Sequence, residues 1–254
     1  MHSPFSLVGR VALVTGASRG LGFGMAQGLA AAGARVVLSG RHVETLQARC
    51  DELAATGAKV GLAAFDVCDR AAADQAIDDI VETHGALDIL VNNAAFGVPR
   101  DFLETSDADW RTALDVALDS CFRLSRKAAA GMVSRGWGRI IMISSVNAHI
   151  SRGTNTSYIT AKAGLEGLTR GMAVELAARG VTVNGIAPGY MATDINTGFR
   201  ADPARYEWIR HRTPMKRWGR PDEIAGAAVF LASEASAFMT GQTIVIDGGM
   251  TIAI

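Results

Sequence analysis

The sequence contains little cysteine and little histidine, and neither residue type forms a recognised ligand pattern. The three cysteines, Cys50, Cys68 and Cys121, lie far apart, and the five histidines show no HxxxH spacing. Scattered thiols are typical of small core residues in a reducing compartment, not of a disulfide framework. We therefore expect a cytoplasmic protein without a metal site, because metal ions need clustered ligands.

An excess of charge of one sign and long apolar runs are also missing. The 25 basic and 25 acidic residues give a formal net charge of zero, so there is no electrostatic indication of a nucleic-acid or membrane-surface partner. No run approaches the roughly 18 apolar residues of a membrane-spanning helix. The first residues lack the basic and apolar regions of a signal peptide. We expect neither nucleic acid nor a membrane as a partner.

What the chain does contain is an alternation of short apolar runs with longer Ala-rich helical patterns. Seven runs predict buried strands, at residues 10–16, 34–40, 59–66, 87–95, 138–145, 180–189 and 242–249. This rhythm is typical of βαβ units with right-handed crossovers and a parallel sheet covered on both faces. No linker interrupts it, so we predict one α/β domain over residues 1–254, a doubly wound sheet of seven parallel strands flanked by helices. The stretch 188–221 is predicted to be a long irregular loop that serves as a lid or mobile segment.

A glycine-rich stretch, "TGASRGLG" (15–22), follows the first strand and opens a helix. Glycines at Gly16, Gly20 and Gly22 allow a tight turn and a close approach of the backbone to a pyrophosphate at the helix N-terminus. The alternative is a tight strand–helix turn with no ligand. Because the stretch occupies the position that a dinucleotide fingerprint requires, the pattern favours cofactor binding.

The end of the second strand indicates which dinucleotide would bind. It reads "LSGRH", with Arg41 where an NAD site places a carboxylate for the ribose 2′-hydroxyl, and Arg19 lies in the glycine loop. Guanidinium groups pair well with phosphate, so the pattern favours NADP(H). Alternatively, Arg41 is an ordinary loop arginine.

The stretch "TSYITAK" (156–162) places a tyrosine four residues before a lysine at the start of a predicted helix. At this spacing Tyr158 and Lys162 share one helix face, and a neighbouring cation favours the phenolate form of a tyrosine. The pair could therefore exchange protons more readily at neutral pH. On the pair alone, the pattern favours a half-buried packing tyrosine and a solvated lysine.

Taken together, the stretches "TGASRGLG", "NNAA" (92–95), "ISS" (143–145), "YITAK" (158–162) and "NGIAPGYMATD" (184–194) resemble the short-chain dehydrogenase/reductase family over nearly the whole chain. The resemblance implies a Rossmann-type fold, a small-molecule carbonyl or alcohol substrate, and assembly into a homodimer or homotetramer. It implies that Tyr158 is the general acid/base, that Lys162 lowers the Tyr158 pKa and binds the nicotinamide ribose, and that Ser145 holds the substrate oxygen.

The resemblance also implies a set of cofactor contacts along the carboxyl ends of the strands. The residues that match them are Gly16, Ser18, Arg19, Gly20, Leu21, Gly22, Arg41, Asp66, Val67, Asn93, Ala94, Tyr158, Lys162, Pro188, Gly189, Met191 and Thr193. Met191 or Thr193 would lie near the nicotinamide carboxamide.

Two positions depart from the family pattern. Ala95 replaces the last glycine of the usual "NNAG", and it is strained if that position needs positive φ. Ala117 stands seven residues after Trp110, where the family often has an asparagine in a proton relay. We expect turnover to be slowed but not abolished.

Within the family, "FSLVGRVALVTG" and the C-terminal stretch resemble gluconate 5-dehydrogenase-type members, which act on a sugar acid. Arg152, six residues before Tyr158, is the candidate for the substrate carboxylate, Arg100 is the second, and both are equally compatible with solvated loop positions. The alternative is a 3-oxoacyl-[acyl-carrier-protein] reductase, for which a basic helix face at Arg123, Arg126 and Lys127 could bind the carrier. A third possibility is a weakly active NADPH-binding sensor.

Overall fold

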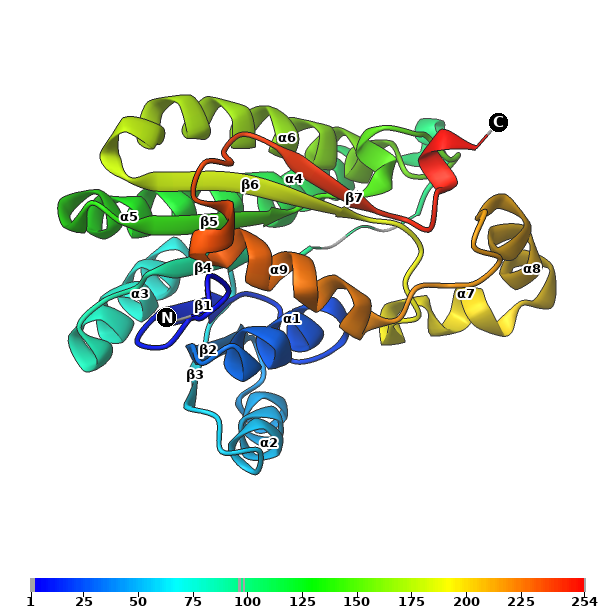
Figure 1. Cartoon of the computed structure of the whole chain (residues 1–254). Coiled ribbons are helices and arrows are strands. Elements are labelled where there is room, and N and C mark those ends of the chain that lie inside the picture. Colours follow the sequence, from blue (N-terminus) through cyan, green and yellow to red (C-terminus); the bar gives the residue numbers. More distant parts are fainter. Residues whose placement is uncertain (1–2, 96, 98, 254) are drawn as a thin grey trace.

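The computed structural model describes residues 3–95, 97 and 99–253 and contains one sheet of seven parallel strands in the order β3-β2-β1-β4-β5-β6-β7 (Figure 1). The strands are β1 (Val11–Val14), β2 (Arg35–Gly40), β3 (Val60–Ala64), β4 (Ile89–Asn92), β5 (Gly138–Ile143), β6 (Val181–Pro188) and β7 (Thr243–Ile246). Each lies within a predicted run, so the predicted fold class and strand number are confirmed. The order reverses between β1 and β4, which is the switch point of a doubly wound sheet.

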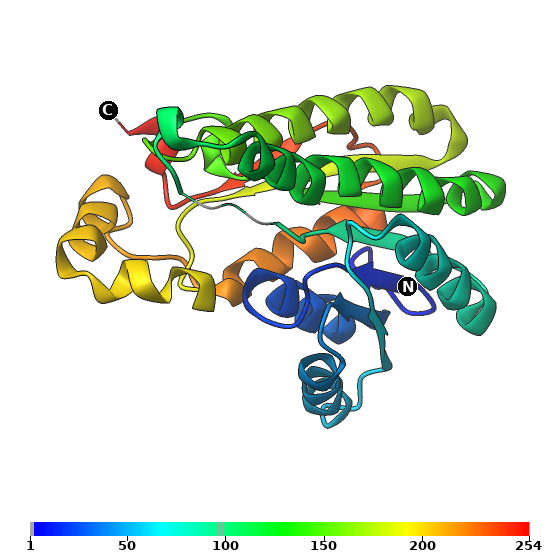
Figure 2. The same ribbon diagram turned by 180° about the vertical axis from the view of Figure 1, so that it is seen from behind.

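Helices cover both faces of the sheet, because neighbouring residues of a strand point to opposite faces. In β1, Ala12 and Val14 pack with α1 (Gly20–Ala31), α2 (Val43–Ala54) and α9 (Ala225–Ala232). Val11 and Leu13 pack on the other face with α3 (Arg70–His84), α5 (Ser120–Arg135) and α6 (Thr156–Leu176). Figure 2 shows the second layer, with α5 and α6 side by side.

The long helical segment over residues 107–135 is interrupted in its middle. It comprises α4 (Asp107–Leu114), a π turn at Asp115–Asp119, and α5. Ser106 caps its amino end by accepting a hydrogen bond from the Asp109 amide. α6 begins at Thr156, as predicted, and its last turn tightens at Ala177–Arg179 before Gly180 (φ +80°).

The prediction that 188–221 is an irregular loop is wrong. The segment contains α7 (Thr197–Ala201) and α8 (Pro203–Arg212), which extend beside the sheet (Figure 1). The Asp202 carboxylate accepts hydrogen bonds from the amides of Ala204 and Arg205, and Pro203 occupies the first turn of α8. This cap and proline are local helix-start signals that outweigh the loop-like composition around them.

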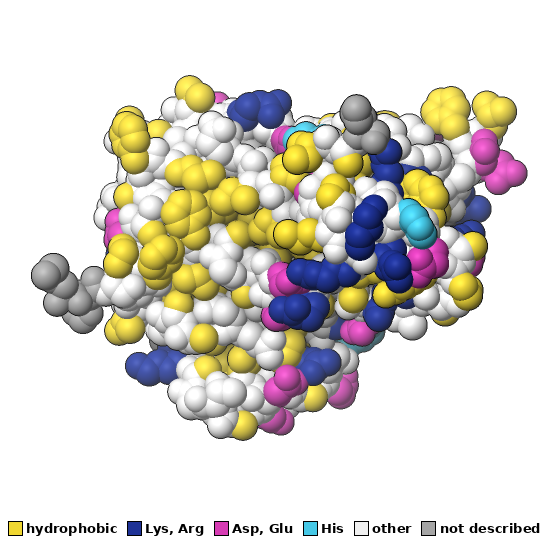
Figure 3. All heavy atoms as spheres, turned by 45° about the vertical axis from the view of Figure 1, so that its right-hand side comes forward, with side chains coloured by type: hydrophobic (Ala, Val, Ile, Leu, Met, Phe, Trp, Pro, Cys, Tyr) yellow, Lys and Arg dark blue, Asp and Glu magenta, His cyan; other side chains and the backbone are white. Residues whose placement is uncertain are grey.

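Basic side chains gather on the side of the molecule that carries this segment (Figure 3). Three of them pair with nearby acids: Arg205 with Asp202 at 3.2 Å, Arg210 with Glu207 at 3.3 Å, and Arg217 with Glu223 at 2.7 Å. The Arg217 guanidinium lowers the pKa of Glu223 to about 2. These three arginines are thus paired with acids in the segment or directly after it.

A buried carboxylate joins β1 to β4 at the amino edge of the sheet. Asp88 Oδ2 accepts a hydrogen bond from the Val11 amide at 2.9 Å, and its Oδ1 lies 3.7 Å from Arg135 Nη2. We predict that Asp88→Ala lowers the free energy of unfolding by about 2–3 kcal/mol, because a buried amide and a guanidinium lose their acceptor. Denaturant unfolding measures this.

The matched control is Asp79→Ala, because Asp79 is an exposed acid that only accepts a hydrogen bond from Gln75 on its own helix. It is expected to change stability by less than about 0.5 kcal/mol. Equal effects of the two substitutions would contradict the role assigned to Asp88.

Candidate active site

The predicted site residues converge on the carboxyl edge of the sheet, and the hydroxyl of Thr15 joins the two strands at the switch point. Thr15 Oγ1 accepts hydrogen bonds from the amides of Asn93 and Ala94, each at 3.0 Å. The Asn93 side-chain amide donates back to the carbonyls of Thr15 (2.8 Å) and Gly16 (3.1 Å). Asn93 and Ala94, two of the predicted cofactor contacts, therefore lie directly beside the glycine loop, whereas the joining role of Thr15 is not apparent from the sequence.

The glycine loop has the geometry of an anion cradle. Gly16 and Gly20 have φ of +63° and +57°, and a Cβ at Gly22 would lie 2.4 Å from the Gly16 carbonyl oxygen. In the part of the chain that the structure describes, no side chain caps the amino end of α1. Its first-turn amides therefore fit a pyrophosphate, which would take the place of a cap.

Arginine side chains surround the outer end of this loop. Arg19 and Arg41 are exposed beside Ser18 and Gly40, as the NADP(H) prediction requires. Arg49 of α2 was not predicted to belong here, yet its Nε donates to the Ser18 carbonyl at 3.2 Å and its guanidinium lies over the Phe23 ring. No sequence signal distinguishes it, because the contact joins elements 31 residues apart.

The two residues predicted to face the adenine follow β3. Asp66 is exposed, and its carboxylate accepts a hydrogen bond from the Cys68 amide at 2.9 Å. Val67 is half-buried against the core cluster on the α3–α5–α6 face. Both lie at the carboxyl edge next to β2, where the adenosine end of a dinucleotide would be.

Tyr158 and Lys162 lie on one face of α6, as predicted. Lys162 is 1% exposed, its Nζ donates to the Ile143 carbonyl at 2.6 Å, and it lies 5.6 Å from the Tyr158 ring centroid. The interpretation of Lys162 as a solvated lysine is therefore wrong. Gly97 passes over the tyrosine, since a Cβ there would lie 3.2 Å from Tyr158 Cδ2. A buried ammonium beside a half-buried phenol can support proton transfer.

Ser145 lies two residues beyond Ile143 and opens a short 3₁₀ turn, Val146–Ala148. Its Oγ accepts a hydrogen bond from the Asn147 amide at 3.1 Å, and the residue is 8% exposed. The end of β5 thus brings Ser145 next to the contact of Lys162 with Ile143. The hydroxyl retains its own proton to donate to an oxygen atom in the site.

The residues after β6 border the site on the other side. Pro188 ends β6, and Gly189 packs so closely on Asp247 that a Cβ would lie 2.7 Å from the Asp247 Cα. Thr193 lies against Gly20 and is 8% exposed. Met191 is buried against Gly219 instead, so of the two alternatives Thr193 is the one adjacent to the glycine loop.

A cavity of about 250 Å³ extends from the glycine loop along the first turns of α1. It is lined by Gly20, Phe23, Gly24, Gln27, Ala192, Thr193, Asp194, Pro221 and Asp222. The segment after β6 therefore forms one wall of the space beside the loop.

An aromatic group lies in the segment after β6. Trp218 packs edge-on against Tyr190 at 5.6 Å between ring centroids, and Phe199 lies 6.3 Å from Tyr190. Arg152 is half-buried with its guanidinium 5.0 Å from the Phe199 centroid, and its Nε is buried without a hydrogen-bond partner within the described chain. Burial raises the pKa of Tyr190.

Arg100, the second candidate for binding the substrate carboxylate, already pairs with an acidic side chain. Its Nε lies 2.9 Å from the Asp109 carboxylate. Of the two arginines, Arg152 therefore has the greater capacity to bind an added anion.

The two departures from the family pattern have different structural outcomes. Among the described residues, positive φ outside glycine occurs only at Thr154 and Lys216, so Ala95 is not strained. Ala117 is fully buried in the π turn, and its carbonyl accepts a weak hydrogen bond from Cys121. Burial raises the pKa of the Cys121 thiol. The slowed turnover expected from Ala117 stays a prediction.

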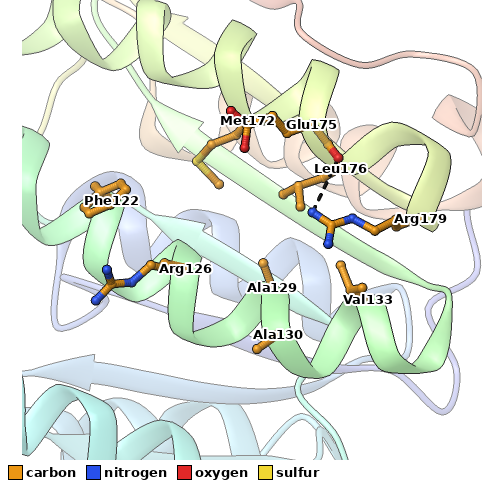
Figure 4. A pocket seen from close by; sticks show the side chains of 9 residues that line it. All are labelled: Phe122, Arg126, Ala129, Ala130, Val133, Met172, Glu175, Leu176 and Arg179. Carbon is orange, nitrogen blue, oxygen red and sulfur yellow. Dashed lines mark hydrogen bonds between the residues drawn. The ribbon is translucent and has the colours of Figure 1, made fainter.

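Two of the three basic residues predicted to dock a carrier protein have neighbours within the chain. Lys127 pairs with Asp78 at 2.7 Å, and Arg126 lies over the Phe122 ring. Arg126 also lines an apolar groove of about 320 Å³ between α5 and the C-terminal half of α6 (Figure 4). Met172, in this groove, lies about 15 Å along α6 from Lys162 at 1.5 Å per residue.

No group of three or more His, Cys, Asp or Glu side chains that could hold a metal ion occurs among the described residues. In the same part of the chain, no helix is both long and apolar enough to cross a membrane.

Comparison with known proteins agrees with this geometry. The family model described as enoyl-(acyl carrier protein) reductase matches residues 16–251. Gluconate 5-dehydrogenase of Gluconobacter oxydans (strain 621H) is 40% identical over 250 residues, covering 98% of each chain. The 3-oxoacyl-[acyl-carrier-protein] reductase FabG of Escherichia coli (strain K12) is 40% identical over 244 residues, 95% of this chain and 97% of the relative.

A solved structure is equally similar. Gluconate 5-dehydrogenase from Burkholderia cenocepacia J2315, in complex with NADP and tartrate, has a TM-score of 0.95 and 41% identity, covering 99% of this chain and 98% of that one. The fold of the whole chain, including the cofactor edge of the sheet, is thus shared with an enzyme that binds NADP.

The close packing at Gly22 yields a test of the cofactor loop. We predict that Gly22→Ala lowers the free energy of unfolding by about 1–3 kcal/mol, because the new methyl group would overlap the Gly16 carbonyl. Binding of NADPH should weaken in parallel, measured by nucleotide fluorescence.

Gly226→Ala is the control, because Gly226 lies in α9 with open space around its Cβ position. Alanine is the better helix former, so this substitution should leave the melting temperature unchanged or raise it. Wild-type NADPH affinity in Gly22→Ala would contradict the assigned geometry.

Proposed function

The chain belongs to the short-chain dehydrogenase/reductase family, and we propose that it interconverts 5-keto-D-gluconate and D-gluconate, or a closely related sugar acid, with NADP(H). The observation that carries this proposal is the buried Lys162, which lies beside Tyr158 on α6 and donates to the carbonyl at the end of β5. Relatives named gluconate 5-dehydrogenase and 5-keto-D-gluconate 5-reductase cover nearly the whole chain, which supports the substrate class.

Tyr158, Lys162 and Ser145 each have a separate role in the proton transfer. NADPH, when bound, supplies the hydride for the carbonyl carbon. Tyr158 donates its phenolic proton to the carbonyl oxygen during reduction and accepts one during oxidation of the alcohol. The Lys162 ammonium favours the phenolate that forms, and Ser145 donates a hydrogen bond that holds the substrate oxygen.

The charges around the glycine loop select the phosphorylated cofactor. Arg19 and Arg41 pair with the 2′-phosphate, and the absence of an acid at the end of β2 removes the partner that NAD would use. The remaining predicted contacts, from Asp66 and Val67 to Pro188 and Thr193, follow the carboxyl edge in the order adenosine to nicotinamide.

Arg152 binds the carboxylate of the sugar acid. Its unpartnered Nε and its place among the aromatic side chains at the substrate end support this role. A 3-oxoacyl-[acyl-carrier-protein] reductase is the second candidate, favoured by the FabG relative, but the paired state of Lys127 leaves that helix face a weaker docking surface. A sensor with little turnover is third, because Ser145, Tyr158 and Lys162 are all retained.

The protein acts in the cytoplasm as a homodimer or homotetramer. Copies pair through the groove between α5 and α6, where Phe122, Ala130 and Met172 present apolar surface (Figure 4). Light scattering of the purified protein measures the assembly.

The proposal is tested by following NADPH oxidation with 5-keto-D-gluconate and with acetoacetyl thioesters. We predict that Tyr158→Phe lowers kcat by at least about a hundredfold, because the proton donor is lost, while NADPH binding is kept. Tyr206→Phe is the matched control, because it also removes only a hydroxyl and keeps the ring that stacks on Trp218 at 6.0 Å, so kcat should stay at the wild-type value. Turnover of the thioester alone would move the assignment to the carrier-protein reductase.

Cofactor choice gives a separate prediction. Arg41→Ala should raise the KM for NADPH by about tenfold or more and leave that for NADH nearly unchanged, because a charge-assisted contact to the 2′-phosphate is lost. Arg35→Ala, at the opposite end of β2, is the control and should change neither value. An equal rise for both nucleotides would contradict a phosphate role.

A further inference from the structure

A buried carboxylate outside the predicted catalytic set contacts the turn that carries Ser145. Glu166 is 8% exposed, although acidic side chains are rarely buried without partners. Its Oε1 accepts a hydrogen bond from Ser144 Oγ at 2.8 Å and lies 3.1 Å from His149 Nε2. Glu166 Oε1 therefore contacts Ser144, before Ser145, and His149, after it.

Glu166 lies on α6, the helix that also carries Tyr158 and Lys162. Tyr158, Lys162 and Glu166 are spaced four residues apart and form one stripe along the helix. Lys162 binds the carbonyl of Ile143, and Glu166 binds the side chain of the next residue, Ser144. Two successive residues at the end of β5 are thus fastened to two successive turns of the helix that carries the tyrosine.

The second contact extends this attachment across the turn. The amides of Ala148, His149 and Ile150 close the turn on the carbonyls of Ser145 and Val146 at 2.9 Å each. His149 Nε2 thus lies close to the same oxygen that accepts from Ser144, so residues on both sides of the turn contact Glu166.

We propose that Glu166 is a positioning residue that fixes Ser145 in register with Tyr158 through its contacts with Ser144 and His149. The inference rests on the proposed roles of Ser145 and Tyr158. Glu166 does not touch the substrate; it sets where the serine hydroxyl lies relative to the phenol. Small displacements of a hydrogen-bonding group of this kind are costly for catalysis.

The kinetic test compares two substitutions of Glu166. Glu166→Leu should lower kcat by about tenfold while KM changes less than about threefold, because Ser145 is displaced but substrate binding is largely kept. Glu166→Gln should stay within about threefold of wild-type kcat, since its amide oxygen still accepts from Ser144. NADPH affinity should be unchanged in both.

The matched control is Thr169→Val, a buried polar side chain on the same helix whose hydroxyl bonds only to its own helix, at the Leu165 carbonyl. It should leave kcat unchanged, which separates loss of positioning from general loosening of α6. Ser144→Ala removes the same contact from its other end and should lower kcat in the same direction. Wild-type kcat in both Glu166→Leu and Ser144→Ala would overturn the proposal.

A measurement that needs no substrate keeps this inference separate from the proposed function. In hydrogen–deuterium exchange, the amides of Ala148, His149 and Ile150 should exchange faster in Glu166→Leu than in the wild type, whereas those around Leu165 should not. Unchanged exchange in the turn would overturn the inference even if the sugar acid is turned over. Faster exchange together with no sugar-acid turnover by the wild type would support the inference and reject the proposed substrate.

Discussion

A buried ammonium group is the constraint around which the candidate site is organised. Lys162 has almost no contact with solvent, and its Nζ donates to the carbonyl at the end of β5. An isolated charge in such a place would be strongly unfavourable, so the ammonium must keep polar partners. The strand end, the helix α6 and the Tyr158 ring are consequently held in one arrangement, because each contributes to the surroundings of that charge.

The rest of the carboxyl edge is fixed by hydrogen bonds between segments that follow different strands. Thr15 and Asn93 join the ends of β1 and β4 at the switch point, while Arg49 holds the glycine loop from the side. These bonds use side chains to bind backbone groups that the sheet leaves unpaired at its edge. A rigid edge of this kind can present a dinucleotide to Tyr158 with little rearrangement.

The opposite wall of the site is formed by the segment after β6 and is rich in aromatic side chains. The segment after β6 carries α7, α8 and the aromatic group around Trp218, and it encloses the space beside Gly20. In this wall aromatic rings pack around Trp218, and backbone hydrogen bonds join Gly219 to Tyr190 and Ala192. The groups proposed for the proton chemistry therefore lie at the sheet edge and on α6, whereas Arg152, the proposed ligand of the substrate carboxylate, lies beside Phe199 in the aromatic wall.

Much of this protein was determined by local sequence pattern. Apolar runs and their alternation with helices gave the seven parallel strands, and the i to i+4 spacing placed Tyr158 and Lys162 on one face of α6, because strand and helix periodicities are properties of neighbouring residues. The quoted stretches also identified the family correctly. In α8 the local signal was present, as Asp202 followed by Pro203, and was outweighed in the prediction by the surrounding composition.

Only the tertiary structure decided which distant residues support the site. The burial of Lys162 against Ile143, the junction at Thr15, the reach of Arg49 to Ser18 and the contact of Glu166 with the Ser145 turn all join residues that are 19 or more positions apart. A sequence pattern does not contain such contacts, since they arise when parallel strands bring their carboxyl ends to one edge. The sequence thus determined the elements and the chemical groups, and the packing of those elements determined which groups hold the others in place.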